Sequence, residues 1–379
     1  MKDTKYTQTE FKVSKIVPAL LEILESESVQ RPFFVVGKAF RSLDIANEIK
    51  AHYPAAKFFE NFTANPIYES VVLGINDFRE KECDFIIAIG GGSTIDVAKC
   101  IKAFAFMDDT DCCLNQTITD NSIKILAVPT TAGTGSEATH FAVIYYNGEK
   151  KSVSHKSLLP EYVILCEKGL ESLPVYQRKT TMLDILCHSI ESLWSVNSTE
   201  VSGKFASDAI ELFVGFYKSY LGNETIGSRK MLYAANYAGK AINITKTTAP
   251  HAMSYKMTSL YGISHGHSVA LCLPRVWEYM TNNLDKCVDA RGAEFLNASF
   301  QYISRLLNCD NVTNAINWID NLIFKELELE PPKLSSEEEL LSLVRSVNTE
   351  RLANNPIILD DLALAEIYNS CLENFRMNE

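Results

Sequence analysis

The 379-residue chain lacks the features that mark several classes of protein. It has no apolar run approaching the ~20 residues that a membrane-spanning helix needs. Its polar first residues contain no apolar stretch of the kind found in a secretory signal. Basic residues are outnumbered, 36 Lys and Arg against 47 Asp and Glu, and a formal net charge of −11 disfavours contacts with nucleic-acid phosphates. We therefore expect a cytoplasmic protein that binds neither membranes nor nucleic acid.

The ten cysteines also lack a functional arrangement. None belongs to a C-x-x-C pair, and apart from the adjacent Cys112 and Cys113 they are scattered singly. A chain of this size does not need disulfides, and a free cysteine often serves as a small buried apolar residue. The pattern argues against a zinc finger or a redox function. Hydrophobic residues make up 46% and charged residues 22% of the chain, a balance that argues against disorder.

The first half of the chain alternates strand-like and helix-like segments. Short apolar runs separated by helices predict buried strands of a parallel sheet. These runs cover residues 32–36, 84–89, 124–128 and 162–166. Asn147-Gly148 predicts a hairpin between strands at residues 141–146 and 151–154, because both turn positions need a positive φ.

After about residue 175 the strand signals fade and apolar residues recur at the 3.6-residue spacing of helices. Helices are predicted over residues 181–194, 207–220, 229–244 and 293–307. Ser336 and Glu339 have the spacing of a capping box that opens a late helix. We predict a Rossmann-like α/β domain with a parallel sheet over residues 1–178, followed by an all-helical domain over residues 179–379.

Two polar loops follow consecutive predicted strands. GGGSTIDVAK at residues 90–99 lets the backbone approach an anion, and the helix that follows would direct free N–H groups at a phosphate. Its spacing is that of neither a Rossmann fingerprint nor a Walker A loop, and a tight turn without a ligand is the alternative. PTTAGTGSEAT at residues 129–139 ends the next strand. Ligands bind at the carboxyl ends of such strands, so the two loops together favour nucleotide binding.

A set of candidate metal ligands lies in the helical half. Asp184 and His188 are four residues apart, so on a helix they share one face. His251 and His265 are 14 residues apart. One Asp and three His can hold a divalent metal and leave a position open for a substrate oxygen. A nitrogen and oxygen set without thiolate suits Fe(II), Zn(II) or Mn(II). Each histidine alone would more often be a hydrogen-bonded core or surface residue.

These motifs, with LDILCHSIES at residues 183–192 and the segment from HAMSY to GISHGH at 251–267, resemble the iron-containing (group III) alcohol dehydrogenases over nearly the whole chain. The resemblance implies a dehydroquinate synthase-like architecture, with an N-terminal dinucleotide-binding domain, a C-terminal helical domain and a metal in the cleft between them. It also implies an NAD(P)-linked oxidoreductase, with Fe(2+), or alternatively Zn(2+) or Mn(2+), and with NADPH or NADH. A homodimer or larger homo-oligomer is the family expectation.

The resemblance further assigns site residues by their place in the motifs. The metal ligands fall on Asp184, His188, His251 and His265. The pyrophosphate loop falls on Gly91, Gly92 and Ser93, and Asp96 of the same motif is a further cofactor-binding candidate. The residues on the nicotinamide side fall on Thr130, Thr131, Thr134 and, next to Lys151, on Lys150.

The coenzyme site departs from the family pattern at Gly37, where many members have an Asp that binds the adenosine ribose. Losing that carboxylate removes repulsion against a 2′-phosphate, and Lys38 or Arg41 can pair with one. We therefore favour NADPH over NADH. The alternative is that Lys38 and Arg41 are plain surface charges.

Two further departures concern the substrate. Tyr255 stands where many members have a second His, so it is a candidate for orienting substrate or transferring a proton, or it simply packs. Lys246, Thr247 and Thr248 replace a small, glycine-rich stretch, and an ammonium with hydroxyls suits a tetrahedral anion. Alternatively, Lys246 reaches solvent and the threonines cap a helix.

The segments NITKTTAPHAMSY and SHGHSVALCLP resemble the phosphonoacetaldehyde reductase branch of the family. We therefore expect the reduction of a small anionic aldehyde, phosphonoacetaldehyde, to 2-hydroxyethylphosphonate. One alternative is a broad iron-dependent alcohol dehydrogenase for neutral alcohols or hydroxy acids. A second is a nucleotide- and metal-binding protein without turnover.

Overall fold

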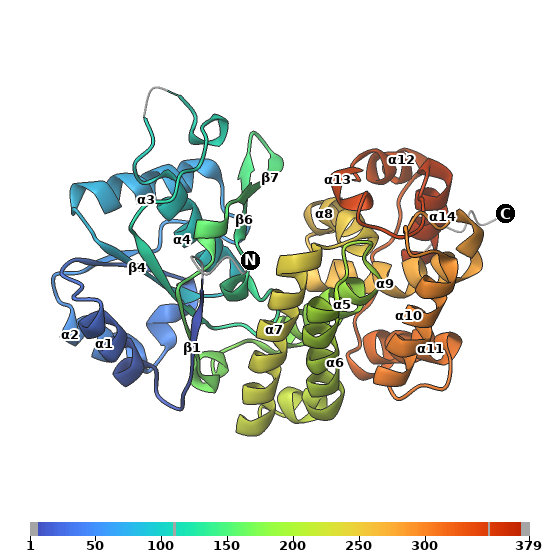
Figure 1. Cartoon of the computed structure of the whole chain (residues 1–379), viewed down its shortest axis with the longest axis horizontal. Helices are drawn as coiled ribbons and strands as arrows, with labels where there is room; N and C mark the ends of the chain where they lie inside the picture. Colours follow the sequence, from blue (N-terminus) through green and yellow to red (C-terminus); the bar gives the residue numbers. More distant parts are fainter. Residues whose placement is uncertain (1–6, 109–110, 348, 373–379) are drawn as a thin grey trace. The chain divides into compact units, whose positions relative to one another are not determined.

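The structure, a computed structural model, describes residues 7–108, 111–347 and 349–372 (Figure 1). The chain forms two compact units. The first contains the chain up to Pro174 together with Gly222–Gly239, and the second contains Val175–Leu221 and the chain from Lys240 onward. Helix α7 (Thr225–Thr245) therefore has residues in both units.

The first unit is built from strands and helices in alternation. Its strands are β1 (Thr9–Lys12), β2 (Pro32–Val36), β3 (Lys57–Phe59), β4 (Phe85–Gly90), β5 (Lys124–Pro129), β6 (Phe141–Tyr146), β7 (Glu149–Ser154) and β8 (Tyr162–Leu165). Its α-helices are α1 (Ile16–Ser26), α2 (Ile45–His52), α3 (Tyr68–Glu80) and α4 (Gly92–Phe104), besides the start of α7. Short 3-10 helices are η1 (Lys38–Ser42), η2 (Cys113–Asn115), η3 (Ser136–Ala138), η4 (Lys156–Leu158) and η5 (Glu167–Leu170).

Six of these strands form a parallel sheet with the order β1-β8-β5-β4-β2-β3. The four predicted strands are β2, β4, β5 and β8, and each is confirmed to within one residue. The two edge strands, β1 and β3, were not predicted. They are short and carry exposed or half-exposed polar residues, because an edge strand is paired and covered on one side only.

Helices cover both faces of this sheet. Phe34, Ile87 and Leu126 belong to one apolar cluster with α1 and α2. Phe33 lies on the opposite face and contacts Phe78 of α3 edge to face, with ring centroids 5.5 Å apart. Successive side chains of a strand point to opposite faces, so all five residues of β2 are buried. This double burial explains why the sequence shows continuous apolar runs instead of alternation.

The predicted hairpin is confirmed. Strands β6 and β7 pair antiparallel in a sheet of their own, with Tyr146 opposite Glu149. The two turn residues, Asn147 and Gly148, have φ values of +51° and +77°. Such values strain most side chains, and asparagine and glycine tolerate them best. Strand β7 begins at Glu149, two residues earlier than predicted.

The second unit is helical. Its helices are α5 (Val175–Trp194), α6 (Glu200–Leu221), the end of α7, α8 (Ala249–Tyr261), α9 (His265–Asn282), α10 (Ala293–Leu306), α11 (Val312–Asn321), α12 (Glu337–Arg345), α13 (Thr349–Leu352) and α14 (Asp361–Cys371), with a 3-10 turn η6 (Leu284–Lys286) and a π-helical turn η7 (Leu322–Glu326). The predicted capping box is confirmed on its serine side, since Ser336 Oγ accepts a hydrogen bond from Glu339 N at 3.2 Å. Across the described ranges, every helix is too short or too polar to cross a membrane.

Candidate functional site

The glycine-rich turn connects β4 to α4. Strand β4 ends at Gly90, Gly91 is the extended N-cap residue, and α4 begins at Gly92. Ser93 lies in the first turn of this 13-residue helix. The first N–H groups of a helix have no carbonyl partner within it, and the helix dipole is positive at this end. The turn therefore offers backbone donors and the Ser93 hydroxyl to an anion.

The second polar loop lies directly beside this turn. Thr130 N donates a hydrogen bond to Gly90 O at 3.0 Å. A Cβ atom added to Gly91 would come within 3.0 Å of the Thr131 side chain, and one added to Gly92 would come within 2.7 Å of the Thr134 hydroxyl. The parallel pairing of β4 with β5 brings the two loops together, and only glycine fits between them.

Asp96 and Lys99 brace the base of the second loop. Asp96 accepts hydrogen bonds from Ser136 Oγ at 2.6 Å and from Val143 N at 3.1 Å. Lys99 is fully buried and donates to Ser136 O at 2.6 Å and to Thr139 Oγ1 at 2.9 Å. Burial lowers the pKa of Lys99 to about 8 and raises the pKa of Asp96. Asp96 was predicted as a cofactor-binding residue. Both of its carboxylate oxygens hold the second polar loop in place.

The predicted adenosine-side residues begin the turn after β2. Gly37 precedes η1, and a Cβ atom added there would lie 3.0 Å from Thr94 Oγ1. Lys38 is exposed. Arg41 is exposed as well, but its guanidinium forms a two-point ion pair with Glu60, with Nε 3.1 Å from Oε2. Glu60, which follows β3 directly, was not among the predicted site residues.

Lys150 and Lys151 differ in their surroundings. Lys150 is half-buried on β7, opposite Tyr145 of β6. Its charge is near enough to Asp96 to favour the ionised carboxylate there. The neighbouring Lys151 forms an ion pair with Glu149, with 2.7 Å between Nζ and Oε2. Of the two lysines, Lys150 is thus the one that lies near Asp96, which holds the second polar loop.

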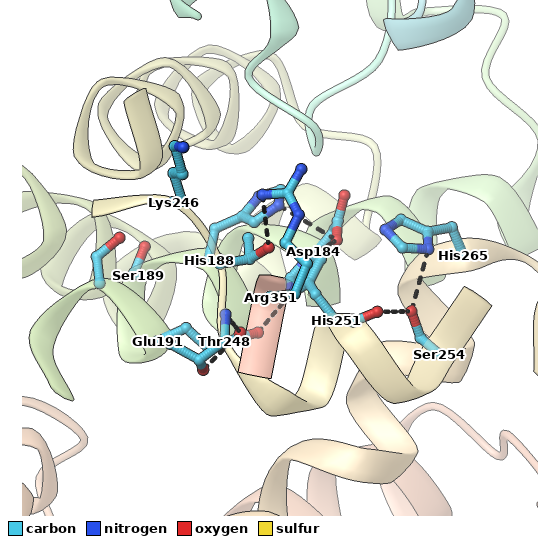
Figure 2. A network of polar contacts seen from close by, with 12 residues as sticks. Asp184, His188, Ser189, Glu191, Lys246, Thr248, His251, Ser254, His265 and Arg351 are labelled. Atoms are coloured by element: carbon cyan, nitrogen blue, oxygen red, sulfur yellow. Dashed lines mark hydrogen bonds and ion pairs between the residues drawn. The ribbon is translucent and has the colours of Figure 1, made fainter. Parts of the chain in front are cut away.

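Three of the four predicted metal ligands converge in the second unit. Asp184 and His188 project from the same face of α5, and His251 projects from the first turn of α8 (Figure 2). All three are buried, and one ligand atom of each lies within 4.8 Å of the others. The rings of His188 and His251 stack with centroids 4.5 Å apart. A carboxylate and two imidazoles so placed match the donors that Fe(II), Zn(II) or Mn(II) take.

The atoms that face one another in this cluster suit a cation. Asp184 Oδ1 and His251 Nε2 lie 3.4 Å apart, and neither has a hydrogen-bond partner among the described residues. Burial alone raises the pKa of Asp184, but the charges of His188 and the neighbouring histidines lower it overall. Burial lowers the pKa of His251, yet the carboxylates of Glu191 and Asp184 outweigh this effect and raise it to about 10. The carboxylates of Asp184 and Glu191 thus favour positive charge in this cluster.

His265, the fourth predicted ligand, is the first residue of α9. Its ring centroid lies 5.3 Å from that of His251, and the ring of Tyr255 stacks on it with centroids 5.9 Å apart. Gly266 lets α9 begin against α5, because a Cβ atom there would lie 2.1 Å from Thr180 O. His265 is therefore beside the cluster, and the ring of Tyr255 lies against it.

The predicted anion-binding segment divides into an exposed and a buried part. Lys246 is exposed and directly follows α7, with φ +58°. Thr247 is buried, and its Oγ1 accepts a hydrogen bond from Arg351 Nη1 at 3.4 Å. Thr248 is fully buried, and both its N–H and its hydroxyl donate to Glu191, at 2.6 and 2.8 Å. Figure 2 shows Arg351 rising from α13 beside the cluster.

Glu191 and Arg351 were not among the predicted site residues. Glu191 comes seven residues after Asp184, so Asp184, His188 and Glu191 share one face of α5. This D-x3-H-x2-E spacing is a signal that could have found it. Arg351 is about 100 residues from Thr247 in the sequence, and no local pattern links the two.

Sequence patterns of one family match both units. The pattern described as "Iron-containing alcohol dehydrogenase" matches residues 14–166, and "Fe-containing alcohol dehydrogenase family, C-terminal" matches residues 179–327. The chain belongs to the iron-containing alcohol dehydrogenase family, which is a family of oxidoreductases. Iron is the metal that gives this family its name.

Individual relatives include aldehyde reductases. "Probable alcohol dehydrogenase EutG" of Escherichia coli (strain K12) is 32% identical over 225 residues, which cover 56% of this chain and 56% of that protein. "Phosphonoacetaldehyde reductase" of Streptomyces viridochromogenes is 30% identical over 238 residues, 59% of this chain and 60% of that protein. The chain thus matches little more than half the length of these relatives.

The fold is shared with solved structures along nearly the whole chain. The crystal structure of sulfoacetaldehyde reductase from Bifidobacterium kashiwanohense, in complex with NAD+, superposes with a TM-score of 0.85 at 24% identity. The match covers 96% of both chains. The predicted fold class, a parallel α/β unit with a helical C-terminal region, is confirmed.

Proposed function

We propose that this chain is a metal-dependent, NAD(P)H-linked reductase that converts a small anionic aldehyde to a primary alcohol. One observation carries the proposal. Asp184 Oδ1 and His251 Nε2 are buried 3.4 Å apart, and neither atom has a hydrogen-bond partner in the described chain. A structural network would saturate such atoms, whereas a metal site leaves them for the ion. Membership of an iron-containing family makes iron the expected ion.

Asp184, His188, His251 and, from the start of α9, His265 would hold the metal. When bound, the metal supplies a Lewis acid that polarises a carbonyl group. The chain contributes burial, which strengthens every electrostatic interaction in the cluster. The carboxylate of Asp184 would offset the positive charge of the metal. Tyr255, stacked on His265, is our candidate for orienting the substrate and passing a proton to its oxygen.

The first unit would hold the dinucleotide. When bound, the nicotinamide supplies the hydride. Gly91, Gly92 and Ser93 would contact the pyrophosphate at the start of α4, and the threonines of the second loop would lie along the nicotinamide. The relevant threonines and lysine are Thr130, Thr131, Thr134 and Lys150. Asp96 serves this site indirectly, through its hydrogen bonds to Ser136 and Val143.

Lys38 and Arg41 remain our candidates for a 2′-phosphate contact. The ion pair of Arg41 with Glu60 opposes that role, because the carboxylate neutralises the guanidinium and repels a phosphate. NADH and NADPH are therefore both tested below. Assembly as a homodimer or larger homo-oligomer stays a family expectation.

Thr247 and Arg351 are our candidates for binding the anionic group of the substrate, with Lys246 as a further charge. A guanidinium with a neighbouring hydroxyl matches a phosphonate in charge and hydrogen bonding. Thr248 supports them through Glu191. Two relatives are named for aldehydes that carry a tetrahedral anion, a phosphonate and a sulfonate. Phosphonoacetaldehyde, giving 2-hydroxyethylphosphonate, is the substrate that we propose.

Steady-state kinetics of the Fe(II)-loaded protein test the proposal. NADH and NADPH oxidation would be followed with a neutral aldehyde, a carboxylate aldehyde and phosphonoacetaldehyde of similar chain length. We expect the highest kcat/KM with phosphonoacetaldehyde. A preference for the neutral or the carboxylate aldehyde would indicate a broader alcohol dehydrogenase. No oxidation with any aldehyde, in protein shown to contain iron, would contradict an enzymatic role.

A further inference from the structure

Glu191 occupies a position that the proposed reaction does not by itself require. Its side chain is fully buried on α5, seven residues after Asp184. A buried carboxylate is strongly destabilising unless hydrogen bonds or a positive charge compensate for its lost hydration. Its surroundings therefore define its role.

One oxygen of Glu191 receives two hydrogen bonds from Thr248. The backbone N–H and the hydroxyl of Thr248 donate to Oε2 at 2.6 and 2.8 Å, and Trp194 Nε1 donates to the same hydroxyl at 2.9 Å. Thr248 is the N-cap residue of α8, and its own side chain makes no capping bond. Glu191 thus supplies the acceptor and the negative charge that the N-terminus of α8 would otherwise lack.

The other oxygen of Glu191 contacts Nδ1 of His251, the third residue of α8 (Figure 2). A carboxylate only accepts hydrogen bonds, so this contact places a proton on Nδ1. A neutral imidazole then has a bare Nε2, and this nitrogen is the one that lies 3.4 Å from Asp184 Oδ1. One side chain therefore fixes both the position of the first turn of α8 and the tautomer of the histidine that it carries.

We infer that Glu191 is a positioning residue that pre-orients His251 as a ligand through Nε2. The inference rests on the proposed metal site and adds a residue to it. Carboxylates that hold the second nitrogen of a ligating histidine tune metal affinity, and their loss typically weakens it about 10- to 100-fold. The companion ligand His265 has a weaker partner, Ser254 Oγ, at 3.5 Å from its Nδ1.

The test compares Glu191→Gln with the wild-type chain, using Co(II) as the probe. A glutamine can accept from either Nδ1 of His251 or the backbone N–H of Thr248, but its amide group then opposes a donor on the other side. We expect a Co(II) affinity about 10- to 100-fold lower, measured by competition with a chromophoric chelator. The visible Co(II) spectrum should change too, because the geometry of His251 is altered.

Glu167→Gln is the matched control. Glu167 is also a buried carboxylate, paired with Arg229 at 2.7 Å, but it belongs to the first unit. This variant should bind Co(II) as the wild type does. Wild-type affinity and spectrum in Glu191→Gln would overturn the inference while leaving the metal site intact. Failure of the wild-type chain to bind Co(II) would instead overturn the proposed function.

A second measurement needs no folded Glu191 variant. In the Zn(II)-loaded wild-type protein, ¹⁵N-labelled histidine should show a downfield ring proton on Nδ1 of His251. The signal is assigned by its loss in His251→Asn. A His251 ring protonated on Nε2 would overturn the inference directly.

Discussion

Two buried charged networks, one in each unit of the protein, differ in how completely their polar atoms are hydrogen-bonded. In the first unit, Lys99 Nζ is surrounded by four oxygen acceptors, and both oxygens of Asp96 accept hydrogen bonds. In the second, Glu191 is equally well satisfied, but Asp184 Oδ1 and His251 Nε2 face each other without hydrogen bonds in the described chain.

This difference distinguishes a network that stabilises the fold from one that is suited to bind a cation. Buried polar groups in native proteins are almost always paired, because an unpaired one costs about 1–3 kcal/mol. The complete network around Lys99 holds a loop in place. In the incomplete network, Asp184 Oδ1 faces Nε2 of His251 at 3.4 Å and Nε2 of His188 at 3.9 Å, a set of donor atoms that can hold a cation. Burial of charge alone would not have told the two apart.

The largest effect is expected for Asp184→Ala. Removing the carboxylate takes away the charge and one donor of the metal cluster, so we expect no stoichiometric metal and no detectable NAD(P)H oxidation. Metal analysis and a coupled absorbance assay check this. Asp208→Ala on α6 is the control and should retain both. Wild-type turnover by metal-free Asp184→Ala would contradict the assignment of the metal site.

Lys99→Met should lower the stability of the fold without affecting metal binding. It leaves Asp96 buried without its cation, so the free energy of unfolding should fall by about 3–5 kcal/mol, measured in urea. Co(II) affinity in the second unit should not change. A variant as stable as the wild type would show that the Lys99 network is not a structural brace.

The difference in stability between the wild type and Lys99→Met should depend on pH. The folded-state pKa of Lys99 is lowered to about 8 from an ordinary 10.5, so between these values the unfolded chain binds more protons than the folded one. Stability therefore rises with pH across this window. The wild type should gain stability relative to Lys99→Met between pH 8 and 10.5. A constant difference would contradict this.

Arg351→Ala tests the proposed substrate contact beside the incomplete network. Loss of a charged hydrogen bond of about 1.5–3 kcal/mol should raise KM for phosphonoacetaldehyde roughly 10- to 100-fold. The KM for a neutral aldehyde should stay the same. Arg345→Ala, at the exposed end of α12, is the control. Equal effects on both aldehydes would remove Arg351 from the anion site.

The smallest effect is expected at the exposed Arg41–Glu60 pair. Glu60→Gln frees the guanidinium, and an exposed ion pair contributes about 0.2–1 kcal/mol. We therefore expect the ratio of kcat/KM for NADPH over NADH to rise by only about two- to fivefold. Glu48→Gln, exposed on α2, should leave the ratio unchanged. A fall in the ratio would exclude Arg41 as a 2′-phosphate contact.

Local patterns predicted the parts of the fold that are buried or tightly constrained. The central strands and the Asn147-Gly148 hairpin follow from apolar runs and turn chemistry. The edge strands β1 and β3 escaped prediction, because their short, polar sequences become strands only when a neighbour pairs with them. Asp96 shows the same limit, since its partners Ser136 and Val143 are 40 and 47 residues away.

The sequence by itself determined the type of the central strands, of the hairpin and of the long helices, and the chemical character of the proposed ligands. Helical and strand periodicity are local, and Asp184 and His188 meet on α5 because four residues complete about one helical turn. Tertiary structure decided which of the charged groups are satisfied. Only packing brings α8 onto α5, so only packing joins Glu191 to Thr248 and His251, and leaves Nε2 of that ring facing Asp184. Such contacts between distant segments depend on position in space, which no local pattern of residues records.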